Sequence, residues 1–102
     1  MNITVLGATG MAGAAIAQEA TRRGHHVTAV SRNPQETNDP HTTVTRLDLT
    51  DLEAPLQPVL NDADAVVLAV RMAPGDESSV APLTSHVLDH AAVAGVRVLV
   101  VG

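Results

Sequence analysis

The chain has 102 residues, of which 45% are apolar and 17% are charged, and it contains no Phe, Tyr, Trp or Cys. This length suits one domain that buries roughly two-thirds of the surface of its unfolded chain, around an aliphatic core. Six arginines and no lysine against eleven acidic residues give a net charge of −5, which opposes binding to nucleic acid or to an anionic membrane. The lack of cysteine excludes disulfides and thiolate chemistry.

The start of the chain, MNITVLGATG, has no basic segment followed by a long apolar run, so we expect no signal peptide. No stretch approaches the roughly eighteen consecutive apolar residues of a membrane-spanning helix. These features predict a cytoplasmic protein without a membrane partner.

Short apolar runs alternate with helical patterns along the chain. The apolar runs predict strands at residues 3–6, 26–30, 43–47, 64–70 and 96–101. The helical patterns predict helices over 11–23, over 51–60, where the helix is short and broken by proline, and from an N-cap at Ser78 or Ser79 to Ala94. Gly24 is expected to end the first helix.

This order of elements predicts parallel strands joined by right-handed crossovers. We therefore expect an α/β fold, a Rossmann-like doubly wound parallel sheet with strand order 3-2-1-4-5. In that order the turn after the first strand lies at the switch point between strands 1 and 4, where such sheets bind ligands.

Three glycines occupy the turn in VLGATGMAG. Gly7 would permit the tight turn, Gly10 would let a pyrophosphate approach the backbone, and Gly13 would let the helix pack closely. The helix N-terminus adds free N–H groups and a positive dipole end. The spacing is G-x-x-G-x-x-G rather than G-x-G-x-x-G, so an ordinary glycine-rich turn is the alternative. The strand before it and the helix after it favour a dinucleotide site.

The residues after the second strand bear on the choice of dinucleotide. An NAD site places an acidic residue there for the ribose 2′-hydroxyl, whereas an NADP site uses an arginine. Here SRNP presents Ser31 and Arg32, with no acidic residue before Glu36. A guanidinium can donate paired hydrogen bonds to a 2′-phosphate, and Ser31 could add another. We expect NADP(H) as the preferred cofactor, with NAD(H) as the alternative; the other interpretation of Arg32 is a solvated loop arginine.

Five segments, in order and spacing, resemble the N-terminal part of atypical short-chain dehydrogenases, specifically the NmrA-like and flavin-reductase-like NAD(P)H-binding proteins: VLGATGMAG, GHHVTAVSRNP, RLDLTD, DADAVVLAV and AGVRVLVVG. The resemblance covers the whole chain and is specific to the cofactor fold, not to one substrate. It implies that residues 1–102 form a partial NAD(P)-binding Rossmann domain. It implies a pyrophosphate site at Thr9, Gly10, Met11 and Ala12, an adenosine-phosphate site at Arg32, adenine contacts at Asp48 and Leu49, and a nicotinamide side at Val70, Arg71 and Met72.

The chain also departs from that family. Its members usually continue past the fifth strand into elements that complete a substrate pocket, so a chain ending at Gly102 is expected to be truncated. Their active site uses a Tyr-x-x-x-Lys pair, and this chain contains neither residue. Catalytic residues are therefore not assigned, and we expect the 102-residue chain alone to be inactive.

Two histidines on the last predicted helix suggest a metal site at first sight. His86 and His90 lie four residues apart, so they share a helix face next to Asp89. A metal would need a third placed ligand, and HVLDH lacks the glutamate of H-E-x-x-H. We expect no metal here, and no nucleophile elbow supports a hydrolase.

Together these patterns predict an NADP(H)-binding module of an oxidoreductase, which in full-length form transfers hydride from NADPH to a flavin- or quinone-like small-molecule acceptor. The alternative is a non-catalytic, NAD(P)-sensing regulator of the NmrA type. The fifth strand would also leave an apolar sheet edge that could pair with a second copy, giving a homodimer.

Overall fold

A computed structural model of the protein describes residues 1–8, 11–32, 39–49, 51, 53, 55–69 and 80–101. In these residues the chain forms strands and helices that alternate except at β2 and β3, which are consecutive among the described elements. In chain order they are β1 (Asn2–Leu6), α1 (Met11–Arg22), β2 (His26–Ser31), β3 (Thr42–Arg46), α2 (Gln57–Asn61), β4 (Ala65–Leu68), α3 (Val80–Ala94) and β5 (Arg97–Val100).

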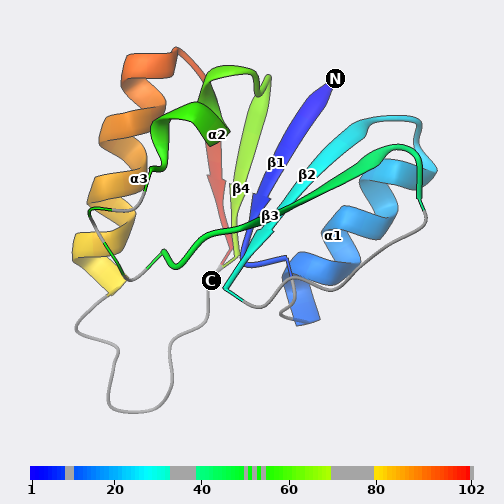
Figure 1. Ribbon diagram of the computed structural model, residues 1–102, viewed down its shortest axis with the longest axis horizontal. Coiled ribbons are helices and arrows are strands. Elements are labelled where there is room, and N and C mark those ends of the chain that lie inside the picture. Colours follow the sequence, from blue (N-terminus) through cyan, green and yellow to red (C-terminus); the bar gives the residue numbers. More distant parts are fainter. Residues whose placement is uncertain are drawn as a thin grey trace.

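The strands form one parallel sheet in the order β3-β2-β1-β4-β5. Figure 1 shows α1 on one face of the sheet and α2 and α3 on the other, with the carboxyl ends of the strands converging at the lower edge of the view. The predicted fold class and strand order are confirmed. The glycine turn after β1 lies at that carboxyl edge. In the sheet, β1 lies between β2 and β4.

The helix predicted over 51–60 is wrong in its first half, because α2 begins only at Gln57. The Asp51 carboxylate accepts a hydrogen bond from the Glu53 N–H at 3.0 Å, and the Asp51 N–H donates to the Asp48 carbonyl at 3.1 Å. This local side-chain bond competes with helix formation, and Pro55 has no N–H to continue a helical turn. The N-cap predicted at Ser78 or Ser79 lies outside the described residues.

Glycines end both long helices in the same way. Gly24 follows α1 with φ +86°, and the His25 N–H donates to the Ala20 carbonyl at 3.0 Å. Gly95 follows α3 with φ +72°, and the Val96 N–H donates to the Ala91 carbonyl at 3.1 Å. This is the left-handed C-terminal motif in which glycine avoids a steric penalty, as predicted for Gly24.

The two faces of the sheet carry separate apolar clusters. Under α1, Val5 and Val27 pack with Ala20, and the small alanines of the helix allow it to lie close to the sheet. Under α2 and α3 the cluster is larger and rich in leucine, including Leu6 and Leu60. With no aromatic side chain available, branched aliphatic residues fill both layers and hold the strand ends in place.

Candidate dinucleotide-binding site

The turn after β1 is held against the end of β2. Gly7 has φ +89°, a backbone conformation that residues other than glycine rarely adopt. The N–H groups of Gly7 and Ala8 both donate to the Val30 carbonyl, at 2.9 and 3.1 Å. These two bonds hold Gly7 and Ala8 against the end of β2 at the carboxyl edge of the sheet.

Gly13 allows α1 to approach this turn closely. A Cβ atom at Gly13 would overlap the Gly7 carbonyl oxygen and would lie 2.9 Å from its carbonyl carbon and 3.1 Å from the Ala8 Cα. Any side chain here would push the first turn of the helix away from the strand-to-helix turn. The packing role predicted for Gly13 is thus present in the structure.

The N-terminus of α1 faces the carboxyl edge of the sheet, as the ribbon shows (Figure 1). Its first turn contains no acidic residue, so the chain does not neutralise the positive end of the helix dipole there. Free N–H groups at such a position suit a pyrophosphate. The backbone geometry therefore fits the dinucleotide that the sequence predicts.

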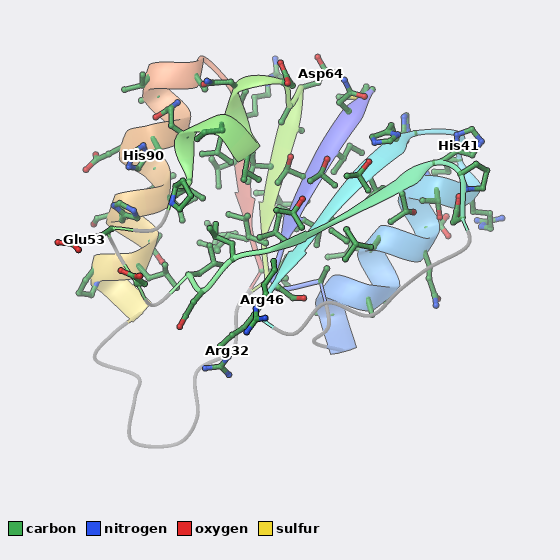
Figure 2. All side chains as sticks on the ribbon, in the orientation of Figure 1. Arg32, His41, Arg46, Glu53, Asp64 and His90 are labelled. Carbon is green, nitrogen blue, oxygen red and sulfur yellow. The ribbon has the colours of Figure 1, made fainter. Side chains whose placement is uncertain are left out.

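The ends of β2 and β3 form the neighbouring part of the site. Ser31 is only 4% exposed, and its carbonyl accepts a hydrogen bond from the Leu47 N–H at 2.9 Å. Arg32 is exposed, and Figure 2 shows it at the same edge as Arg46, the last residue of β3. Arg32 is thus the accessible member of the predicted Ser31–Arg32 pair.

The remaining residues predicted to contact the cofactor differ in their exposure. Ala12 is exposed on α1, and Asp48 is half-buried beyond the end of β3. Leu49 is 9% exposed and packs in the apolar cluster beneath α2 and α3. The other predicted contacts, Thr9, Gly10, Val70, Arg71 and Met72, lie outside the described residues, as does the side chain of Met11.

Arg46 is a further residue at this edge that the sequence alone did not single out. The predicted strand order already places the third strand beside the second, and the structure adds the register, in which Arg46 pairs with Ser31. In the sequence, the only signal for Arg46 is its position near the end of the third predicted strand.

Two other arginines are held away from this site. Arg22 and Arg23, at the far end of α1, bind the Glu19 carboxylate at 2.6 and 2.9 Å. Hydrogen bonds from Arg22 and Arg23 hold the pKa of Glu19 below its usual value. These ion pairs lie at the C-terminal end of α1 and do not contribute to the carboxyl edge of the sheet.

The paired histidines of α3 have a structural role. The His86 and His90 rings meet edge to face with centroids 4.6 Å apart, and His90 Nδ1 lies 2.6 Å from the Gln57 Oε1 of α2. Across the described ranges, no group of three or more His, Cys, Asp or Glu side chains is arranged to hold a metal ion. His90 therefore links α2 to α3.

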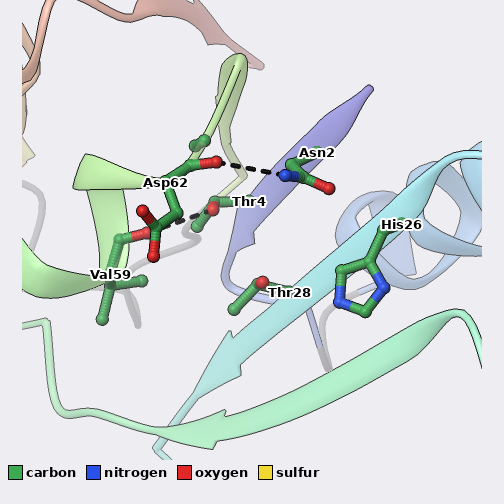
Figure 3. A pocket seen from close by; sticks show the side chains of 7 residues that line it. Asn2, Thr4, His26, Thr28, Val59 and Asp62 are labelled. Carbon is green, nitrogen blue, oxygen red and sulfur yellow. Dashed lines mark hydrogen bonds between the residues drawn. The ribbon is translucent and has the colours of Figure 1, made fainter.

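A pocket of about 350 Å³ lies at the opposite, amino edge of the sheet (Figure 3). Asn2, Thr4 and His26 line it from β1 and β2, and Val59 and Asp62 line it from the α2 region. The Asn2 amide donates to the Asp62 carbonyl and the Thr4 hydroxyl to the Val59 carbonyl, both at 3.3 Å. These bonds are made within the chain and join β1 to α2, remote from the glycine turn.

A parallel sheet of this order, with a glycine turn at its switch point that leads directly into a helix, defines a dinucleotide-binding domain of the Rossmann class. The sequence supports the same class independently. The chain belongs to the NAD(P)H-binding family, whose sequence profile matches residues 7–102. A nicotinamide dinucleotide is accordingly the cofactor class of this fold.

Known proteins share this architecture. The uncharacterized protein YwnB of Bacillus subtilis (strain 168) is 40% identical over 77 residues, which are 76% of this chain and 35% of YwnB. A solved structure from Burkholderia pseudomallei, provisionally named an exported protein, is 41% identical with a TM-score of 0.76, and the match covers 100% of this chain and 47% of that one. A Streptococcus pneumoniae protein, provisionally named an NADH-flavin reductase, is 34% identical with a TM-score of 0.74 over 100% of this chain and 47% of that one.

The chain therefore spans half or less of the length of these relatives. In the part of the chain that the structure describes, no helix is both long and apolar enough to cross a membrane.

Proposed function

We propose that residues 1–102 form the NADPH-binding module of a cytoplasmic oxidoreductase that reduces a flavin- or quinone-like acceptor. The family supports a nicotinamide dinucleotide, and the Streptococcus pneumoniae relative is named for flavin reduction. A flavin- or quinone-like acceptor is the class of substrate that this relative's name supports.

The single observation that carries the NADPH assignment is Arg32. It is exposed directly after β2, where an NAD site places an acidic residue, and the next acidic residue in the chain is Glu36. Within the described ranges the structure gives its guanidinium no ion pair. A 2′-phosphate would supply the paired acceptors that this group favours.

The other residues at this edge have binding and orienting roles in the proposal. The turn at Gly7 and the N-terminus of α1 would hold the pyrophosphate, while Asp48 would border the adenine. When bound, the dinucleotide supplies a hydride, and the chain supplies position and electrostatics. Val70, Arg71 and Met72 are proposed for the nicotinamide side.

Arg32→Ala tests the cofactor assignment. The change should weaken NADPH binding by about 1.5–3 kcal/mol, the range for a hydrogen bond to a charged group, and should leave NADH binding nearly unchanged. Both nucleotides are titrated against both proteins, followed by nicotinamide fluorescence. Arg97→Ala is the matched control, since Arg97 is an exposed arginine at the amino end of β5. Equal losses for NADH and NADPH would refute the NADPH assignment.

A non-catalytic NAD(P)-sensing regulator is the second candidate, because the family and the fold support a dinucleotide site without implying that the bound cofactor is consumed. The two candidates differ in whether bound NADPH is consumed. Loss of nicotinamide absorbance with a flavin or quinone, in a form of the protein that also carries an acceptor-binding region, supports the reductase. Tight NADPH binding without turnover on any flavin, quinone or aldehyde supports the regulator.

A further inference from the structure

A second arginine lies at the same carboxyl edge of the sheet as Arg32. Arg46 ends β3, and the register pairs it with Ser31, the residue before Arg32. The hydrogen bond from the Leu47 N–H to the Ser31 carbonyl, at 2.9 Å, holds the chain after β3 against the end of β2. Two guanidinium groups that are fourteen positions apart in sequence (32 to 46) are thus carried by adjoining strand ends (Figure 2).

Both guanidinium groups are available to a ligand. Arg32 and Arg46 are exposed, and neither is hydrogen-bonded or ion-paired through its side chain to any residue in the described part of the chain. In contrast, Arg22 and Arg23 share the Glu19 carboxylate. In a chain of net charge −5, two arginines at one sheet edge that no carboxylate of the described residues binds form a local positive site. Their mutual repulsion would be relieved by a dianion.

The position of this pair matches one part of a dinucleotide. With the pyrophosphate at the turn between β1 and α1, the adenosine ribose lies at the end of β2. The strand beyond β2 in the sheet is β3, so the end of β3 borders the place where the ribose would lie. A phosphate monoester there can accept hydrogen bonds from two guanidinium groups at once.

We propose that Arg46 is a specificity-determining residue that binds the 2′-phosphate of NADPH together with Arg32. This inference rests on the proposed function, because it concerns the same dinucleotide site. It adds that the preference for the phosphorylated cofactor depends on β3 as well as on the SRNP segment. Arg46 interacts with the phosphate as a fork of donors, so lysine replaces it only in part.

The test compares Arg46→Gln with Arg46→Lys in the 102-residue chain. Dissociation constants are measured for NADPH and NADH, and for 2′,5′-ADP and 5′-AMP as probes that lack nicotinamide. We expect Arg46→Gln to weaken binding of NADPH and of 2′,5′-ADP about tenfold or more, with NADH and 5′-AMP changed less than twofold. Arg46→Lys should lose less than Arg46→Gln. Arg97→Gln controls for the loss of one positive charge, and circular dichroism verifies that each variant folds.

The wild-type titration distinguishes failure of the NADPH assignment from failure of the role proposed for Arg46. A wild-type chain that does not prefer NADPH over NADH overturns the cofactor assignment, and this inference with it. A wild-type preference that Arg32→Ala removes and Arg46→Gln leaves intact overturns this inference alone. In the double variant, Arg32→Ala with Arg46→Gln, we expect losses that are not additive, because both groups bind one phosphate. Additive losses would show that the two arginines act at separate places, against this inference.

Discussion

The two described glycines of the turn, Gly7 and Gly13, are needed for different reasons. Gly7 adopts φ +89°, so its requirement is conformational. Gly13 lies within α1, and its requirement is steric, because a Cβ would overlap the Gly7 carbonyl oxygen. A hydrogen side chain at both positions brings the helix N-terminus directly beside the end of β1.

Gly13→Ala should therefore affect both folding and binding. Separating α1 from the turn costs about 1–3 kcal/mol, as for other overpacked positions, and moves the N–H groups that face the ligand. We expect a lower free energy of unfolding in urea and weaker binding of NADPH and NADH alike.

Gly24→Ala is the matched control. Gly24 has φ +86° but open space around its missing Cβ, so alanine there introduces backbone strain without a clash. It should cost about 1–2 kcal/mol of stability and leave dinucleotide binding intact. If both variants lost binding to the same degree, the effect would follow from stability and the steric role of Gly13 would be disproved.

Among the elements, α2 depends most on tertiary contacts. It has five residues and contains Pro58, and a helix of this length has no stability of its own in water. The side chain of Leu60, a residue of α2, is fully buried. The Thr4 hydroxyl of β1 donates to the Val59 carbonyl of α2, and Gln57 of α2 bonds to His90 of α3. Packing thus keeps α2 helical and holds the crossover from β3 to β4 on the sheet.

Leu60→Ala tests this dependence. Removing the buried side chain leaves a cavity in the leucine-rich cluster and should cost about 2–5 kcal/mol. Chemical denaturation measures the loss, and amide exchange of residues 57–61 should rise. Val93→Ala serves as control, because Val93 is 79% exposed on α3 and its truncation should change stability by less than about 0.5 kcal/mol. Similar losses in the two variants would contradict the role given to α2.

At the scale of the whole molecule, the sheet has an apolar edge at β5. Among the described strands β5 pairs only with β4, while Leu99 is 62% and Val100 is 50% exposed. Successive strand residues point to opposite faces, so both faces of the sheet are apolar here, and Arg97 is the one charged residue of the strand. Such an edge can pair with another strand.

We therefore predict that the 102-residue chain self-associates through β5. The double variant Leu99→Lys with Val100→Lys places two charges at the edge and should shift the chain from dimer to monomer in sedimentation at equal concentration. Val93→Lys, on α3, controls for added charge at another exposed valine. A double variant that associates as strongly as the wild type would show that β5 is not the interface.

The sequence by itself determined the order of elements, the parallel sheet, the glycine turn and the end of α1 at Gly24. These features are local: strand and helix periodicity, and the conformational freedom of glycine, act within a few residues. The same locality explains the failure at 51–60. The proline break in this segment is visible in the sequence, but the Asp51 side chain also bonds to the Glu53 backbone and competes with helical propensity, which the helix pattern does not record.

Only the tertiary structure decided which distant residues meet. The register between β3 and β2 pairs Arg46 with Ser31, and the approach of α1 to the turn gives Gly13 its steric role. The α2 contacts with β1 and α3 arise in the same way. These contacts depend on the register of parallel strands and on helix packing between segments far apart in the chain. Burial of the shared aliphatic core selects that register and packing, and the local sequence pattern does not.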